Sequence, residues 1–397
     1  MHADRQCAEA QISALEQIMF TEQYADKVIE RVLGEQTYWD LTNRQTFVTD
    51  TYNIIRWWRK LVVALGGDDA RPSLWHVWGA YQLLNSKTLP DWSELAELNV
   101  EQLIGNLDNA TCAQVNSYPD WLWQRASNEL GEQWLSVAQG LNIPAKTYLR
   151  TNTLKTNAPA LQVELARENI ACQLLPDTDT LEVTKYGHLF KSNAFSQGWF
   201  EMQDAGSQHI APLLNVKPGQ RVVDACAGAG GKSLHIAALM QNKGYVLSMD
   251  IHQHKLDILK KRAKRAGVHM LETRLIKNSK TVKRLKDKFD CVLLDVPCSG
   301  TGVLRRNPDA KWQLANDNIE NLITLQGEIL QRYSQMCKPG GRLVYATCSI
   351  LPSENQQQVQ AFLANNPEFK LVEEVSLLPG VNTEYDGFYG AALERQP

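Results

Sequence analysis

The sequence lacks several features that would place it in a special class of proteins. None of its eight cysteines forms a Cys-x-x-Cys pair, which argues against a zinc site or a disulfide framework. No apolar run approaches the roughly 18 residues of a membrane span, and the first residues lead into no signal-peptide core. With 44% hydrophobic residues and only 15 prolines, the chain is neither disordered nor collagen-like. We therefore expect a cytoplasmic, monomeric protein without a metal.

The charge of the chain is unevenly distributed. A net charge of -3 over 397 residues gives by itself little sign of a nucleic-acid partner. Residues 255–288, however, contain three acidic residues and many basic ones. Such a run is either a solvated helix face or a surface that contacts phosphates, and its position beside the motifs described below favours the second interpretation. The basic residues are Lys255, Lys260, Lys261, Arg262, Lys264, Arg265, Arg274, Lys277, Lys280, Lys283, Arg284, Lys286 and Lys288.

The first 140 residues predict a helical domain. Apolar residues recur at three-to-four spacing over residues 8–19, 24–33, 44–65 and 74–84. Much of the tryptophan content lies here, and we expect these rings to pack in a core rather than to stack on bases. The acidic surplus of this region makes a nonspecific RNA clamp doubtful, so structural support and contact with a protein both remain open.

The next region, residues 141–205, predicts a small α+β module. Strand-like runs near residues 146–152 and 181–184 flank a helix over residues 158–168. From residue 206 to the C-terminus we expect a third domain, in which strand, turn and helix alternate. Alternation of this kind indicates a doubly wound, mostly parallel sheet covered by helices on both faces. Strands are predicted over residues 221–225, 245–250, 273–276, 289–295 and 342–347, and helices over residues 232–240, 252–266, 314–336 and 353–365.

A glycine-rich turn follows the first strand of this third domain, over residues 224–232. Glycines let the backbone approach a ligand, and the following helix N-terminus offers free N–H donors. Cys226 breaks the Walker pattern and Ser233 breaks the dinucleotide pattern, so a pyrophosphate is not required. Asp250 ends the second strand, where a carboxylate accepts hydrogen bonds from ribose hydroxyls. The turn therefore suits S-adenosylmethionine.

Two cysteines follow two later strands. Cys298 comes soon after Asp295, and Cys348 directly follows the strand that begins at Arg342. Because carboxyl ends of parallel strands form the ligand crevice, these three side chains are expected to converge there. Taken alone, either cysteine is better explained as a small buried residue. Together the three suit cytosine chemistry, in which a thiolate adds to C6, an acid stabilises N3 and a second group helps to remove the C5 proton.

Over about residues 118–395, the sequence resembles the Sun/RsmB-like family of RNA cytosine-C5 methyltransferases. The most specific motif is Asp295-Val296-Pro297-Cys298-Ser299-Gly300-Thr301-Gly302, continuing to residues 305–312. A second is Tyr345-Ala346-Thr347-Cys348-Ser349, with Glu354-Asn355 following. Residues 148–155 and 203–208 also look like family landmarks. The resemblance implies a Rossmann-like, class I S-adenosylmethionine-dependent domain over residues 206–397, and an RNA-binding role for the ferredoxin- or RRM-like module.

The resemblance also implies the roles of individual residues. Cys348 is the nucleophile, Cys298 assists product release, Asp295 contacts the cytosine and Lys232 orients Asp295 or nearby backbone. The implied cofactor-binding residues are Cys226, Ala227, Gly228, Ala229, Gly230, Gly231, Lys232, Asp250, Asn278 and Asp295.

Two residues depart from the family pattern. Ala229 stands where the family usually has Pro, which is expected to loosen the turn slightly. Asn278 stands where Asp is usual, and it loses a charge while keeping an acceptor oxygen. We expect weaker cofactor binding. The favoured substrate is 16S ribosomal RNA. Transfer RNA is the alternative among enzymes, and a non-catalytic ribosome-assembly factor on the same fold is the alternative outside them.

Overall fold

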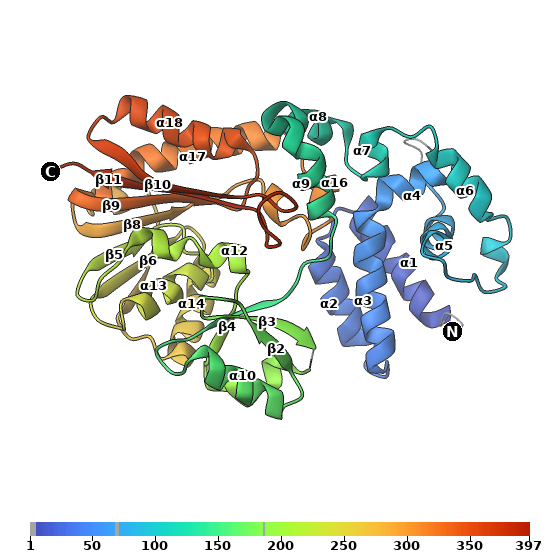
Figure 1. Ribbon diagram of the computed structural model, residues 1–397, viewed down its shortest axis with the longest axis horizontal. Helices are drawn as coiled ribbons and strands as arrows, with labels where there is room; N and C mark the ends of the chain where they lie inside the picture. The colour runs from blue at the N-terminus through green and yellow to red at the C-terminus, as the bar shows by residue number, and fades with distance from the viewer. Residues whose placement is uncertain (1–4, 68–70, 186) are drawn as a thin grey trace. The chain divides into compact units, whose positions relative to one another are not determined.

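The computed structural model describes residues 5–67, 71–185 and 187–397 (Figure 1). The chain forms two compact units: Met1–Ile143 with Leu304–Asn316, and Pro144–Val303 with Asp317–Pro397. Within the described ranges, no helix is long and apolar enough to cross a membrane. The same residues contain no group of His, Cys, Asp and Glu side chains placed to hold a metal ion.

The first unit is helical, as predicted. Its longer helices are α1 (Arg5–Phe20), α2 (Ala25–Glu35), α3 (Leu41–Arg56), α4 (Trp58–Ala64), α5 (Leu74–Leu84), α6 (Val100–Leu107), α8 (Asp120–Leu130) and α9 (Trp134–Leu141). The short helices are α7 (Cys112–Val115) and α16 (Ala310–Gln313). The predicted helix over residues 44–65 is two helices, because the backbone of Trp57 leaves the helical conformation at φ -102° and ψ 15°.

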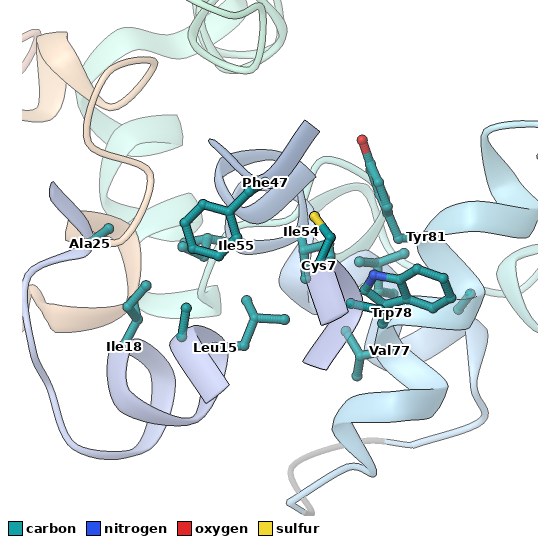
Figure 2. Close-up of a cluster of buried hydrophobic side chains, with 14 of the residues drawn as sticks. Cys7, Leu15, Ile18, Ala25, Phe47, Ile54, Ile55, Val77, Trp78 and Tyr81 are labelled. Carbon is teal, nitrogen blue, oxygen red and sulfur yellow. The ribbon is translucent and has the colours of Figure 1, made fainter. Parts of the chain in front are cut away.

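A hydrophobic core holds the first helices together. Figure 2 shows Leu15, Phe47, Ile54 and Trp78 among the side chains that fill it, and each of these is buried. The tryptophans of this region pack mainly on one another and on the core, as Trp78 does against Trp92 with ring centroids 5.6 Å apart. Core packing of these rings is therefore confirmed.

Residues 304–316 belong to this helical unit, although the sequence placed them in the catalytic domain. Lys311 is fully buried, and its Nζ donates to the carbonyl oxygens of Arg56 and Ser117, each at 3.2 Å, and to Asn142. Trp312 donates from its ring nitrogen to the carbonyl of Ile55 at 2.9 Å. The second part of the long family motif, residues 305–312, therefore packs among the helices of the first unit. The predicted boundaries at residues 140 and 205 stay a prediction.

The second unit begins with the small α+β module. It contains β1 (Tyr148–Thr151), α10 (Ala158–Arg167), β2 (Ala171–Leu174), β3 (Thr180–Lys185), α11 (Asn193–Ser196) and β4 (Phe200–Met202). The sheet order is β2-β3-β1-β4, and every pair is antiparallel. This is the β-α-β-β-α-β arrangement of a ferredoxin-like fold. The predicted α+β fold is confirmed.

A seven-stranded sheet follows, in the order β10-β11-β9-β8-β5-β6-β7. Its strands are β5 (Arg221–Asp224), β6 (Tyr245–Asp250), β7 (Leu271–Leu275), β8 (Phe289–Asp295), β9 (Cys337–Thr347), β10 (Phe369–Leu377) and β11 (Phe388–Arg395). Strands β5 to β9 pair in parallel, whereas β11 is antiparallel to both β9 and β10. The predicted doubly wound, mostly parallel sheet is confirmed, and the last two strands were not foreseen.

Helices cover both faces of this sheet (Figure 1). Alternate strand residues point to opposite faces. Val222 and Val344 pack with α13 (Gly231–Leu239) and α14 (Gln253–Ala266). Val223 and Leu343 pack on the other face with α15 (Ser279–Lys283), α17 (Asn316–Tyr333) and α18 (Gln356–Asn365). With both faces buried, the carboxyl ends of the parallel strands are left to form a site.

Candidate active site

The glycine turn joins β5 to α13 and requires glycine at two positions. Gly228 and Gly230 have φ of +53° and +89°, a region that residues with a Cβ atom rarely adopt. A Cβ on Gly230 would also lie 2.4 Å from Cγ of Leu259. The turn is tied to the next strand by the amide of Ala227, which donates to the carbonyl of Met249 at 2.9 Å.

Asp250, at the end of β6, braces two loops at once. Its Oδ2 accepts from the amide of Gly228 at 2.9 Å, and its Oδ1 accepts from the amide of His252 at 2.8 Å. The sequence suggested a ribose contact for this carboxylate and missed its bracing role. Two acceptor atoms with further lone pairs can do both, because each oxygen accepts more than one hydrogen bond.

A cavity of about 310 Å³ opens at these strand ends. Four of the predicted site residues, Cys226, Gly228, Asp250 and Asp295, contribute to its wall. The remaining wall is largely apolar with a few polar groups, the usual character of a small-molecule site. One side comes from α17, which the sequence did not predict to reach the site. The other lining residues are Ala225, Ile251, His252, Lys255, Ile276, Val296, Pro297, Leu325, Glu328, Ile329, Arg332 and Tyr333.

Neither of the two departures from the family pattern is among the residues that line this cavity. The carbonyl of Ala229 accepts from Arg262 at 2.8 Å, which fixes the turn at that residue. Asn278 is exposed and caps α15, where its side-chain oxygen accepts from the amide of Lys280 at 3.1 Å. Ile276, two residues earlier, is the residue of this segment that lines the cavity. The structure therefore does not bring Asn278 into the wall.

Lys232 and Asp295 form an ion pair at one edge of the cavity. Lys232 Nζ lies 2.7 Å from Asp295 Oδ2, and both side chains are mostly buried. Burial by itself would lower the pKa of Lys232, but the charge and hydrogen bond of Asp295 outweigh it, and the pKa is raised.

The two cysteines meet at the ends of adjacent parallel strands. Cys298 follows β8 and Cys348 follows β9, and their Sγ atoms are 3.3 Å apart. The two loops are joined by the amide of Gly302, which donates to the carbonyl of Cys348 at 2.9 Å. The hydrogen bond with Cys348, burial and the nearby negative charges hold the pKa of Cys298 well above its usual range. The structure thus brings together the thiols that the sequence placed in one crevice.

Asp224, at the end of β5, lies buried behind the site. The hydroxyl of Ser233 donates to its Oδ2 at 2.6 Å, and Ser248 in turn donates to Ser233 at 2.8 Å. Burial raises the pKa of Asp224 to about 7, with a further rise from the charge of Asp295 and a partial offset from the Ser233 hydrogen bond. The sequence showed this residue at the start of the glycine turn and gave no sign of its protonation.

Comparison with known proteins agrees with this geometry. A family described as "16S rRNA methyltransferase RsmB/F" matches residues 211–394, and its "ferredoxin-like domain" matches residues 118–185. The ribosomal RNA small subunit methyltransferase B of Vibrio vulnificus is 34% identical over 290 residues, which cover 70% of this chain and 67% of that relative. The chain belongs to the RsmB/F family. The resemblance seen in the sequence is confirmed.

Other relatives of this RsmB/F-family chain carry the same name. The protein of Klebsiella pneumoniae strain ATCC 700721 is 36% identical over 286 residues, covering 70% of this chain and 65% of its own length. The "probable" methyltransferase B of Bacillus subtilis is 34% identical over 260 residues, covering 65% of this chain and 58% of its own length. The chain thus spans about 58% to 67% of the length of these curated relatives.

Solved structures share the fold. The crystal structure of PH0851 superposes with a TM-score of 0.80 at 23% identity and covers 100% of both chains. A methyltransferase homolog from Pyrococcus horikoshii has a TM-score of 0.64 at 26% identity, covering 72% of this chain and 97% of its own. NSun6 of Pyrococcus horikoshii, solved with SFG, has a TM-score of 0.65 at 21% identity, covering 71% of this chain and 100% of its own.

Proposed function

We propose that the protein methylates C5 of a cytosine in RNA, with S-adenosylmethionine as methyl donor and 16S ribosomal RNA as substrate. The observation that carries this proposal is the thiol pair, whose Sγ atoms lie 3.3 Å apart beside a cavity lined by Asp295. One thiol is enough for a covalent adduct, and a second beside it suits a reaction in which the adduct must also be released. The family and the names of the relatives support the RNA substrate.

The cavity fits the proposed cofactor. Its largely apolar wall suits an adenine ring, and Asp250 offers carboxylate oxygens to ribose hydroxyls at the end of β6. The NSun6 structure was solved with SFG, an S-adenosylmethionine analogue, which supports the same ligand class here. S-adenosylmethionine supplies a methyl group on a positively charged sulfur. The residues proposed to hold it are those of the glycine turn, Asp250 and Asp295. Asn278, which caps α15 outside the cavity wall, is a further candidate.

The side chains of the site divide the remaining work. Cys348, as thiolate, forms a bond from its sulfur to C6 of the cytosine, and the electron pair of the C5–C6 double bond then attacks the methyl group through C5. As a carboxylate, Asp295 accepts a hydrogen bond from the amino group of the cytosine, and the ammonium of Lys232 beside it offsets the negative charge that grows at N3 during the addition. Lys232 holds Asp295 in place through the 2.7 Å ion pair. These roles need a carboxylate held by an ammonium near the nucleophilic sulfur. The Asp295–Lys232 ion pair and the place of Cys348 at the end of the neighbouring strand β9 support them.

Release requires that the C5 proton leave and the bond between sulfur and C6 break. The C5 proton passes to a solvent water acting as base, because Cys298 is held as a thiol. The electron pair of the C5–H bond restores the C5–C6 double bond, and the sulfur of Cys348 departs as thiolate. We assign assistance in this step to Cys298, because its thiol lies 3.3 Å from the departing sulfur and can share a hydrogen bond with it. A protonated partner stabilises a thiolate at that distance.

RNA phosphates are proposed to contact a basic surface on and around α15. The basic run separates into two parts in the structure. On α14, Arg262 and Arg265 are held by Glu201 at 2.8 and 2.5 Å. By contrast, six side chains over residues 277–288 are exposed cations, and exposed cations can neutralise phosphates. They are Lys277, Lys280, Lys283, Arg284, Lys286 and Lys288.

The test is to incubate the protein with tritiated S-adenosylmethionine and total RNA that lacks its own modification. Size separation shows which RNA takes the label, and bisulfite mapping identifies the cytosine. Label at one cytosine of small-subunit ribosomal RNA is the expected result. Label in transfer RNA would keep the chemistry and replace the substrate. No label in any fraction, with cofactor binding intact in calorimetry, would refute methylation and favour an assembly factor on the same fold.

A further inference from the structure

A buried carboxylate lies behind the two cysteine loops. Glu354 ends the short helical turn Pro352–Glu354, and its side chain is fully buried. Its Oε1 accepts from the amide of Ser299 at 2.8 Å and from Gln326 at 2.9 Å. Its Oε2 accepts from the hydroxyls of Ser299 and Ser349, each at 2.5 Å. Four donors therefore converge on one carboxylate in a place that water does not reach.

The four donor groups belong to three residues, two of which stand next to the thiols. Ser299 directly follows Cys298, and Ser349 directly follows Cys348. The third donor, Gln326 of α17, also donates to the carbonyl of Pro297 at 3.0 Å, one residue before Cys298. Each loop is thus fixed to the same carboxylate within one residue of its sulfur, the Cys298 loop through both oxygens and the Cys348 loop through Oε2. A shift of either loop would break at least one buried hydrogen bond, which is costly because the freed donor finds no water.

We propose that Glu354 is a positioning residue that holds the Cys298 and Cys348 loops together through one shared carboxylate. The importance of this role for catalysis rests on the proposed function, because the proposed reaction uses both cysteines. The family motif contains Glu354, but the sequence alone gives it no partner. The geometry supplies both partners and places the carboxylate outside the cofactor cavity, whose wall it does not join.

The charge of Glu354 has a second effect on the pair. Cys298 faces three titratable groups: Cys348 across the pair, Glu354 behind the loop and Tyr345 on β9. The pKa of Cys298 is raised by its hydrogen bond with Cys348, by burial, and by the negative charges of Cys348 and Glu354. Glu354 therefore helps to keep Cys298 a thiol beside Cys348.

Thiol chemistry tests this proposal without RNA. Diamide oxidises two neighbouring thiols to a disulfide and takes up their two hydrogens, so its rate reports how well the sulfurs are held together. In E354Q, which keeps the length of the side chain and removes its charge, we expect the Cys298–Cys348 disulfide to form about tenfold more slowly once the rate is divided by the thiolate fraction of Cys298, which the alkylation profile gives. E374Q is the matched control, because Glu374 is an exposed acid on β10 that bonds only Tyr389 among the contacts described. It should oxidise at the rate of the unaltered protein.

The pH dependence of alkylation separates charge from position. Initial rates of iodoacetamide labelling at Cys298 are read by peptide mass spectrometry, with the exposed Cys112 as reference in the same sample. In E354Q the Cys298 profile should move to lower pH. In E354D, which keeps the charge and shortens the side chain, the profile should stay near that of the unaltered protein while the disulfide still forms slowly.

Cofactor binding by calorimetry shows whether each variant is folded, and E354D carries the test if E354Q is not. Disulfide formation at the unaltered rate in both variants, with an unchanged Cys298 profile in E354Q, would overturn the proposal. Because none of these measurements uses RNA or methyl transfer, they stand even if the proposed reaction is refuted.

Discussion

Two groups of loops follow the carboxyl ends of the parallel strands, and they differ in how many hydrogen bonds fix them. On the cysteine side, after β8 and β9, the loops are locked by buried hydrogen bonds to Glu354 and by the contact of Gly302 with Cys348. On the cofactor side, after β5, β6 and β7, the loops surround an open cavity, and Asn278 is exposed. Both departures from the family pattern, Ala229 and Asn278, lie on the cofactor side. Bond formation needs fixed atoms, whereas a ligand that makes many contacts tolerates the weakening of one.

The largest expected effect separates the two cysteines. Cys348→Ala should abolish methyl transfer, a loss on the order of a thousandfold or more, because no other side chain replaces the nucleophile. Cys298→Ala should instead stall after transfer and leave RNA covalently attached, visible as a retarded band on a denaturing gel. Both proteins should bind the cofactor normally, since neither sulfur lines the cavity. Methyl transfer retained by Cys348→Ala would contradict the assignment of the nucleophile.

A pair of glycine substitutions compares the two sides directly. A Cβ at Gly302 would lie 2.2 Å from the carbonyl oxygen of Gly387 and 2.7 Å from that of Cys348, and backbone cannot move aside. We expect Gly302→Ala to lower the free energy of unfolding by about 3 kcal/mol and to slow the reaction. At Gly230 a Cβ would lie 2.4 Å from Cγ of the buried Leu259, a side chain that can repack in part, whereas the backbone carbonyls at Gly302 cannot. We expect Gly230→Ala to cost less than Gly302→Ala, with about 1–2 kcal/mol of its cost from the left-handed backbone.

Denaturant unfolding measures both glycine effects, and calorimetry shows whether Gly230→Ala weakens cofactor binding while Gly302→Ala does not. Equal losses of stability would remove the proposed difference in rigidity.

Asp224, on the cofactor side, should make the free energy of unfolding depend on pH. In the folded chain its pKa is about 7, mainly because of burial, whereas the unfolded chain releases this proton near pH 4. Between these values the folded state binds more protons, so stability falls as the pH rises. From pH 6 to pH 8 the contribution of Asp224 should drop by about 1.4 kcal/mol.

The measurement is the unfolding free energy of the unaltered protein minus that of Asp224→Asn at each pH, which cancels the other titrating groups. A difference that stays constant from pH 6 to pH 8 would show that Asp224 does not titrate there.

Much of this fold could be predicted from the sequence. The glycine turn, Asp250, Asp295 and both cysteines follow predicted parallel strands, and a parallel sheet brings such residues to one edge. The strands β10 and β11 escaped prediction because most of β10 is exposed, so it lacks an apolar alternation, and β11 contains Gly390, Ala391 and Ala392. The assignment of residues 304–316 also failed, because a motif that runs on along the chain gives no sign of entering another unit.

The finer structure of the site could not be predicted because it depends on contacts between distant residues. Glu354 is five residues from Ser349 but 55 from Ser299, and only folding shows that one carboxylate serves both. The residues of α17 that line the cavity are also far in sequence from the glycine turn. Periodicity places a helix against a sheet, and it does not show which end of the helix reaches the ligand.

The smallest expected effect concerns Asn278 on the cofactor side. Asn278→Asp restores the residue usual in the family, and a carboxylate is a stronger acceptor for a ligand N–H or hydroxyl than an amide oxygen. The gain is limited, because Asn278 is exposed and its oxygen already accepts from the amide of Lys280 at 3.1 Å. We expect calorimetry to show S-adenosylmethionine binding tighter by about threefold or less, as for other exposed charges. Unchanged affinity would remove Asn278 from the cofactor site, whereas a gain of tenfold or more would show that the cofactor side is as finely placed as the cysteine side.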